Sequence, residues 1–138
     1  MKLLCFQARR FRWKTFSKTL DDVPDLDLEE EVTDAVVVFL HAERSDESDE
    51  ARTRAFKRSL KHIKWLLNKR DCKNVVLHSF THLGGENAAP DFARVFLDDL
   101  AERLRGTGYS SWTTPFGYFC EWTLDVYGES LAKVWKEI

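Results

Sequence analysis

The sequence predicts a layered α/β domain in which one mixed β-sheet packs against two long helices. The segment 35–40 is continuously apolar, as expected of a strand buried on both faces of a sheet, and the segment 74–80 is apolar enough to be a second interior strand. Two longer segments, 49–70 and 90–105, space their apolar residues three and four apart, which is the period of an amphipathic helix. Strands and helices that alternate in this way favour a layered α/β arrangement.

Length and composition favour a single globular domain. The chain has 138 residues, of which 43% are hydrophobic and 32% are charged, as in proteins with one core. We therefore expect residues 1–138 to form one domain. No apolar run approaches the length of a membrane span, and the N-terminus lacks a secretory signal pattern. The expected location is the cytoplasm, with no membrane partner.

Cysteine usage and glycine motifs argue against several classes of protein. The three cysteines are widely spaced and form no CxxC pair, so the sequence indicates neither a disulfide framework nor a zinc ribbon. The GxGxxG and GxxxxGK[ST] motifs of dinucleotide and Walker-type phosphate binding are also absent. We expect no cofactor.

The N-terminal third supplies one bent strand or a hairpin, followed by a loop. Residues 2–7 are mostly apolar, and residues 10–15 alternate polar with aromatic side chains, which is the period of a half-buried strand. The acidic segment 21–34 contains Pro24 and has no apolar period, so we expect an exposed loop there. Ser45, Asp46 or Ser48 can cap the helix that follows the buried strand 35–40.

The C-terminal third is expected to hold two further strands and a helix. Segments 109–113 and 119–127 have the composition of strands, and Pro115-Phe116-Gly117 joins them. We expect the last segment, 129–137, to be a short helix.

The charges are unevenly distributed along the chain. The first nineteen residues carry only basic charges, whereas 21–34 is strongly acidic, and the net charge is −2. Arg10, Arg12 and Lys14 would form a basic stripe beside Phe11 and Trp13, a composition that suits phosphate contact with base stacking. Two alternatives stay open: the two segments attract each other as solvated surface, and the aromatic residues form the core face of a sheet.

Three polar features stand out as candidates for chemistry. They are the turn 78–87 after a buried strand, the segment 114–121, and Lys133 near the C-terminus. In α/β sheets, ligands are commonly bound where such strands end. His78, His82 and Cys120 include the residue types of a metal site, but the His-x3-His pair straddles a strand end, so we expect no metal. Cys120 with His82 as its base would form a thiol hydrolase, although an unpaired cysteine in a strand is more often a small buried hydrophobe.

The stretch from Val75 to Leu83, with its FTHL piece, is followed by Pro90 and then by the PFGY of residues 115–118. In this order and spacing, and with the opening MKLL, the chain resembles the N-terminal editing domain of archaeal-type threonyl-tRNA synthetases over essentially its whole length. Because the sequence ends at Ile138 with no synthetase catalytic core, we expect a free-standing homologue.

The resemblance implies a D-aminoacyl-tRNA deacylase-like fold, usually homodimeric, and hydrolysis of serine wrongly attached to threonine tRNA. His82 would line a pocket that admits serine and excludes the extra methyl group of threonine. The facing wall would be formed by Pro115, Phe116, Gly117, Tyr118 and Phe119. One methyl group gives only about 1–3 kcal/mol of discrimination, which is why synthetases use a second, hydrolytic site.

Several positions depart from the family pattern. The position of the family's catalytic lysine is occupied by Cys120, its acidic partner position is occupied by Lys133, and its usual His-Ser-Asp is replaced by residues 7–9, Gln-Ala-Arg. One hypothesis is that Lys133 faces the pocket beside Glu121 and supplies the missing ammonium group. Cys120 and Glu121 are then the other candidates for catalytic residues. Water would then attack the ester, with the RNA and the backbone stabilising the transition state.

Other functions remain compatible with this sequence. The chain could be a catalytically silent module that binds tRNA through Arg10, Arg12 and Lys14, or a deacylase that removes D-amino acids from tRNA. The thiol hydrolase with Cys120 and His82 is a more distant alternative.

Overall fold

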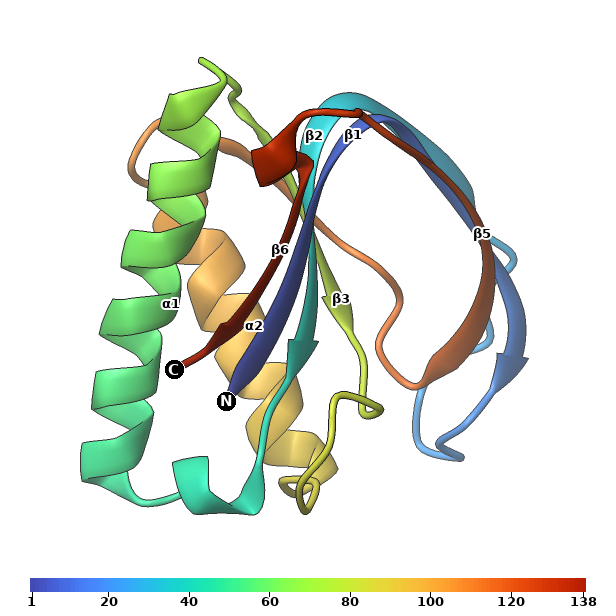
Figure 1. Cartoon of the computed structure of the whole chain (residues 1–138). Helices are drawn as coiled ribbons and strands as arrows, with labels where there is room; N and C mark the ends of the chain where they lie inside the picture. Colours follow the sequence, from blue (N-terminus) through green and yellow to red (C-terminus); the bar gives the residue numbers. More distant parts are fainter.

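The computed structural model describes all residues, 1–138, and shows a curved, mixed six-stranded sheet with both long helices on one face (Figure 1). The strands are β1 (Lys2–Lys18), β2 (Glu29–His41), β3 (Asn74–Ser79), β4 (Ser110–Thr113), β5 (Tyr118–Val126) and β6 (Lys133–Glu137), the helices are α1 (Asp49–Lys69) and α2 (Pro90–Arg105), and the short 3-10 turns are η1 (Arg44–Asp46) and η2 (Ser130–Ala132).

The sheet combines antiparallel and parallel pairs, in the order β4-β3-β2-β1-β5, with β6 also paired to β1. Strand β1 is antiparallel to β2, β5 and β6, whereas β2–β3 and β3–β4 are parallel. The helices α1 and α2 make the parallel crossovers. The mixed sheet and the two long helices expected from the sequence are therefore confirmed.

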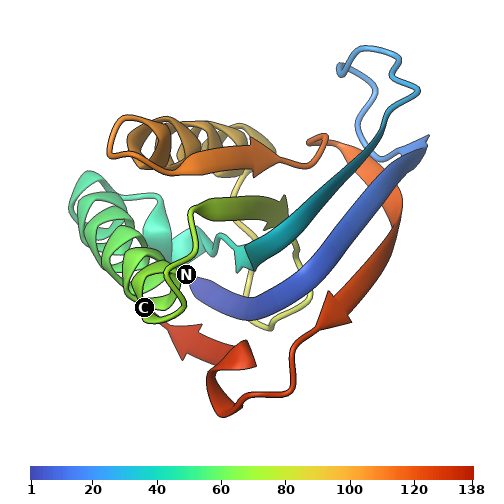
Figure 2. The ribbon, with the colours of Figure 1, turned by 90° about the horizontal axis from the view of Figure 1, so that it is seen from above.

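Strand β1 runs the whole length of the sheet and bends in the middle. Residues 2–6 pair with β6, and the pairing passes to β5 from Ala8 onward, with a register shift between Ala8 and Arg10. A bulge of this kind bends a strand and increases its twist. Seen from above in Figure 2, the bend carries the second half of β1 away from the helices together with β5. The opening segment is thus one bent strand rather than a hairpin.

The main core lies between the helices and the sheet. Ile63, Leu66 and Leu67 of α1 and Phe96 and Leu100 of α2 are fully buried against the strands. Burial of each such side chain contributes about 1.5–3 kcal/mol. Helix α1 begins as expected, because the Ser48 side chain accepts a hydrogen bond from the Ala51 amide at 3.3 Å. No helix is both long and apolar enough to span a membrane.

A second, smaller core fills the concave side of the curved sheet. Its centre is Phe39, whose ring lies 5.5 Å from that of Phe6 and 5.2 Å from that of Phe80. Phe11 and Trp13 belong to this cluster and are fully buried. The alternation of residues 10–15 therefore reflects the core face of a strand, and these two aromatic residues are not exposed for base stacking.

Two expectations about secondary structure are wrong. The acidic segment 21–34 is a loop only as far as Leu28, because Glu29 to Glu31 pair with the basic part of β1 and begin β2. The segment 129–137 is not a helix: after the η2 turn it forms β6, which pairs with residues 2–6 of β1. In both cases the partner that decides the structure is distant in sequence.

Candidate functional site

A cavity of about 550 Å³ lies where β3 and β4 end and β5 begins. Its walls come from the loop after β3, the first turn of α2, the segment between β4 and β5, and the end of β1. The residues that line it are Thr19, Leu20, Ala42, His78, Ser79, Phe80, Thr81, His82, Asn87, Ala88, Pro90, Ala93, Thr114, Pro115, Phe116, Gly117, Tyr118, Phe119, Cys120 and Trp122. The structure therefore brings the loop of His82 and the Pro115–Phe119 segment together around one hollow, as expected.

The loop that carries His82 is fixed to the end of β2. The buried His41 accepts a hydrogen bond from the Leu83 amide at Nδ1, at 3.2 Å, and the Ala88 amide donates to the Ala42 carbonyl at 3.0 Å. Glu47 accepts from the Ala89 amide at 2.7 Å and so caps the start of α2. These bonds hold residues 80–89 against the sheet, and His82 packs its ring edge-to-face 5.2 Å from that of Phe80.

The facing wall is held by the loop between β1 and β2. The Tyr118 hydroxyl donates to the Pro24 carbonyl at 2.6 Å and accepts from the Leu26 amide at 2.9 Å. Gly117 has φ +80°, and its carbonyl accepts from the Thr19 amide at 2.7 Å. A Cβ at this position would meet Val23 at 2.8 Å. The PFGY segment thus requires glycine both for its backbone conformation and for the close packing of this loop.

A buried polar pair forms the floor of the cavity. His78 Nδ1 lies 2.7 Å from Thr114 Oγ1, and both residues are more than nine-tenths buried. Burial lowers the pKa of His78 to about 4, so its imidazole is neutral at pH 7. Both residues belong to the polar segments that the sequence marks as candidates for chemistry, but the sequence does not predict that they pair with each other. The signal available was a polar residue within the buried strand β3 and a second one directly before PFGY.

The cavity contains no lysine, arginine, aspartate or glutamate. Cys120 lines it, and burial raises the pKa of this thiol, so the thiol is protonated at neutral pH. No group of three or more histidine, cysteine or acidic side chains is arranged to hold a metal ion. The site offers hydroxyl, amide and imidazole groups and lacks a fixed side-chain cation.

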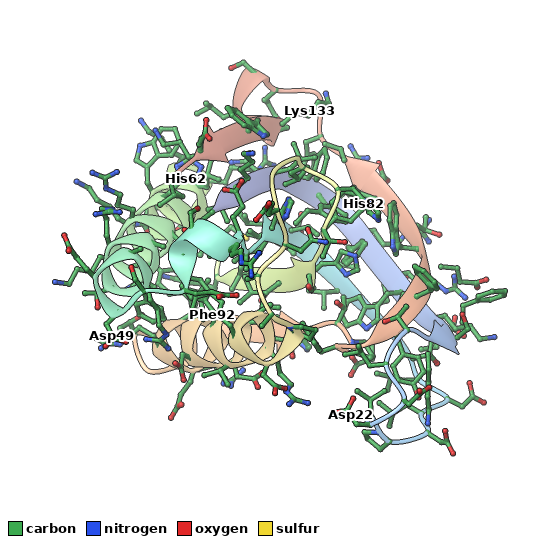
Figure 3. All side chains as sticks on the ribbon, turned by 90° about the horizontal axis from the view of Figure 1, so that it is seen from below. Asp22, Asp49, His62, His82, Phe92 and Lys133 are labelled. Atoms are coloured by element: carbon green, nitrogen blue, oxygen red, sulfur yellow. The ribbon has the colours of Figure 1, made fainter.

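The structure does not bring Lys133 and Glu121 together, so the hypothesis that they face the pocket side by side is wrong. Lys133 pairs with Phe6 on β6, and Glu121 pairs with Lys14 on β5. Roughly 26 Å of strand separates Phe6 from Lys14 at 3.3 Å per residue. Neither residue lines the cavity, and Figure 3 shows Lys133 at the β6 end of the sheet, apart from the loop of His82. The misplacement follows from expecting a helix where β6 forms.

The predicted tRNA contacts lie on the outer face of the curved part of β1, where acidic side chains accompany them. Arg12 Nε lies 2.6 Å from Glu29 Oε1, and Arg10 lies 3.8 Å from Glu31. Lys14 is flanked by Glu29 of β2 and Glu121 of β5 in the sheet register. Much of the basic charge of this stripe is therefore offset within the sheet.

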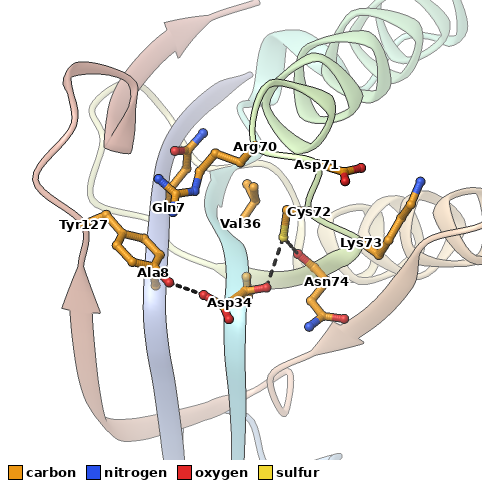
Figure 4. A pocket seen from close by; sticks show the side chains of 11 residues that line it. Gln7, Ala8, Asp34, Val36, Arg70, Asp71, Cys72, Lys73, Asn74 and Tyr127 are labelled. Carbon is orange, nitrogen blue, oxygen red and sulfur yellow. Dashed lines mark hydrogen bonds between the residues drawn. The ribbon is translucent and has the colours of Figure 1, made fainter.

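A second hollow, of about 340 Å³, lies beside the bend of β1 and is lined by Gln7 and Ala8 (Figure 4). Its polar groups largely bond to one another: the Tyr127 hydroxyl is hydrogen-bonded to Asp34, and the Arg70 guanidinium lies 3.9 Å from the Tyr127 ring centroid. This network ties the junction of β5 and β6 to the end of α1, which indicates a structural role for the hollow.

Comparison with known proteins identifies the class. Among solved structures, the c-Myc DNA Unwinding Element Binding Protein superposes with a TM-score of 0.70 at 13% identity and covers 100% of this chain and 99% of its own. The two proteins share the layered, mixed α/β fold that the sequence predicts for this chain.

The sequence comparisons identify the family. The model of the archaea-specific editing domain of threonyl-tRNA synthetase matches residues 1–138. Threonine–tRNA ligases of Staphylothermus marinus and Pyrobaculum islandicum are 29% and 27% identical over 100% and 97% of this chain. The chain spans 22% of the length of each of these relatives. It belongs to the archaea-specific threonyl-tRNA synthetase editing-domain family.

Proposed function

We propose that this domain hydrolyses the ester bond of a mischarged aminoacyl-tRNA, with serine attached to threonine tRNA as the substrate. The observation that carries the proposal is that His82 and the PFGY segment, the two motifs of the family resemblance, line one cavity in a chain that matches the editing family from end to end. The threonine–tRNA ligase relatives support threonine tRNA as the nucleic-acid part of the substrate.

In this mechanism the cavity positions the ester and a water molecule, and the RNA supplies part of the catalysis. His82 and the Pro115–Phe119 wall bound the space for the amino-acid side chain, so that serine fits and threonine is excluded by its methyl group. Because the cavity has no side-chain cation, neutral hydrogen-bond donors and the ribose hydroxyl next to the ester must stabilise the developing negative charge.

The test is ester loss from seryl-tRNA and threonyl-tRNA, both on threonine tRNA, and from a D-aminoacyl-tRNA, each measured against buffer alone. We expect seryl-tRNA to lose its ester faster with the protein than in buffer, and threonyl-tRNA to be spared. The His82→Ala variant should lose the discrimination, because it enlarges the space for the amino acid. Ester loss at the buffer rate for every aminoacyl-tRNA would contradict the proposal, and preferential loss from D-aminoacyl-tRNA would reassign the substrate.

A second candidate, a module that binds aminoacyl-tRNA without hydrolysing it, is favoured by one observation. Cys120 stands in the position of the family's lysine, and the cavity has no lysine from another position. This candidate predicts that the protein protects seryl-tRNA from spontaneous hydrolysis. Protection and accelerated hydrolysis are opposite outcomes of the same assay.

We also propose that the domain works as a homodimer in the cytoplasm. The support is the face of the sheet opposite the helices, which leaves the aromatic side chains of Trp122 and Trp135 44% and 54% exposed. Large exposed apolar side chains that gather on one face are typical of protein interfaces.

A further inference from the structure

The outward face of α1 is a continuous basic surface. No aspartate or glutamate occurs between Ala51 and Arg70, although the chain as a whole has a net charge of −2. The basic residues of this stretch are Arg52, Arg54, Lys57, Arg58, Lys61, Lys64, Lys69 and Arg70. Eight of the 21 lysine and arginine residues of the chain therefore lie in this stretch, with no acidic residue among them.

Half of these eight basic residues are solvent-exposed and have no carboxylate partner. Lys57, Arg58, Lys61 and Lys69 are exposed, and none of them forms an ion pair. Arg54 reaches only Glu50, at 3.8 Å, whereas Arg52 and Arg70 are paired at the margins of the face. From Arg54 to Lys69 the helix extends the charge over about 22 Å.

An exposed aromatic side chain lies within this basic surface. Trp65 is 41% exposed and stacks on His62, with the ring centroids 5.7 Å apart. Tryptophan in this setting is typical of surfaces that stack against nucleic-acid bases or sugars while the surrounding cations contact phosphates.

The contrast with β1 decides which basic surface is available to a polyanion. The arginines of β1 have carboxylate neighbours at 2.6 and 3.8 Å, and a bound phosphate would have to compete with these. The exposed cations in the middle of α1, Lys57, Arg58 and Lys61, have no carboxylate partner, so phosphates bound there need displace only counterions.

We propose that the outward face of α1, centred on Lys57, Arg58, Lys61 and Trp65, binds the phosphate backbone of the RNA whose 3′ end enters the cavity. The identity of that RNA rests on the proposed function. An anionic membrane fits less well, because the apolar face of α1, with Ile63, Leu66 and Leu67, is sealed in the core and cannot insert into lipid.

The test compares two sets of neutralised variants in binding to uncharged threonine tRNA. The triple variant Lys57→Gln/Arg58→Gln/Lys61→Gln removes charge from α1, and the double variant Arg10→Gln/Arg12→Gln removes it from β1. Glutamine keeps the helix propensity of the replaced residues, so α1 should stay folded, and a thermal unfolding curve checks this. Binding is measured between about 50 and 200 mM salt, the range over which phosphate contacts lose most of their affinity.

We expect the α1 variant to bind more weakly. The slope of log K against log salt is negative, and its magnitude should fall by about three, one for each lost cation. The β1 variant should retain the wild-type slope. Trp65→Ala should weaken binding at every salt concentration without changing the slope. A wild-type slope in the α1 variant, or loss of the slope in the β1 variant alone, would overturn the proposal. So would equal competition by polyglutamate or by anionic vesicles.

The binding assay and the deacylation assay can fail independently. Uncharged tRNA has no ester, so its salt-dependent binding reports on α1 even if the protein hydrolyses nothing. If seryl-tRNA is hydrolysed, the α1 variant should raise KM and leave kcat unchanged, because its residues lie outside the cavity. A lowered kcat at unchanged KM would instead place these residues in the reaction and contradict a backbone-binding role.

Discussion

At the residue scale, the state of the Cys120 thiol distinguishes a hydrolase with a cysteine nucleophile from one in which water attacks the ester. Its thiol lines the cavity, and burial raises its pKa, so the thiolate needed for nucleophilic attack is scarce at pH 7. We therefore expect Cys120→Ala to retain deacylation within about threefold, since the reaction uses water rather than a thiol ester. Initial rates of ester loss measure this.

A second variant at the same position tests whether the absence of a lysine in the cavity limits the rate of ester hydrolysis. Cys120→Lys places an ammonium group where the family has its lysine, and we expect it to raise kcat above the wild-type value through electrostatic stabilisation of the transition state. An inactive Cys120→Ala protein together with inactivation by iodoacetamide would instead establish the thiol mechanism.

The buried His78 makes stability depend on pH. Its pKa is lowered to about 4 in the folded protein, whereas the unfolded chain has a histidine pKa of about 6.5. Below pH 6.5 the unfolded state binds a proton that the folded state does not, so stability is lost as the pH falls toward 4. Between pH 7 and pH 5 the loss attributable to His78 is about 2 kcal/mol.

Urea unfolding at pH 7 and pH 5 checks this prediction. The control is His78→Gln, in which an amide replaces the imidazole beside Thr114 and no longer titrates. Carboxylates also titrate over this range, so the informative quantity is the difference between the two pH dependences. If wild type and His78→Gln lose the same stability between the two pH values, the imidazole is not held neutral.

At the scale of secondary-structure elements, the strands with strong local patterns are predictable from sequence and those defined by distant partners are not. The apolar period fixes α1 and α2 closely, and the run 35–40 marks the buried half of β2. The sequence SLAKVWKE fits a helical period as well as a strand period, and only its pairing with residues 2–6 of β1 makes it β6. Glu29 to Glu31 extend β2 because the basic part of β1 lies opposite them.

The turn between β4 and β5 provides a prediction at the same scale. Gly117→Ala should destabilise the fold by about 1–3 kcal/mol, because alanine at φ +80° is strained and its Cβ collides with Val23. The Tyr118 wall should shift with it and lower deacylation. Gly128→Ala is the matched control, since no atom lies within 4 Å of a Cβ there and its φ is not in the left-handed region. Equal urea midpoints for the two variants would show that the turn tolerates a side chain.

At the scale of the whole molecule, the sequence predicts which segments form the site better than which side chains point into it. His82 and the Pro115–Phe119 segment line one cavity, as the resemblance to the editing-domain family implies from the two sequence motifs that contain them. Lys133 was misplaced because its position depends on the register of β6 with β1. The attraction between the basic and acidic segments is one of the alternatives that the sequence leaves open, but the individual partners, such as Arg12 with Glu29, depend on how β2 folds back on β1.

The face of the sheet opposite the helices predicts how the chain assembles into a dimer. Trp135 lies opposite Leu4 in the β1–β6 pairing, and Phe6, two residues further along β1, packs against the concave core around Phe39. Directly paired residues on neighbouring strands share a face, so Trp135 extends this apolar surface although it is 54% exposed. A second copy of the chain would remove this surface from water.

We therefore expect light scattering to give twice the chain mass of 16.2 kDa for the wild type. Trp135→Asp should give the single chain mass, because a dimer would bury the new charge without a partner. Trp65→Asp changes the same residue type on α1, away from this face, and should remain dimeric.

Because Trp122 lies both on the exposed aromatic face and in the lining of the cavity, dissociation should also lower deacylation. A wild-type protein that stays at the single chain mass at high concentration would exclude the dimer and leave the cavity complete within one chain.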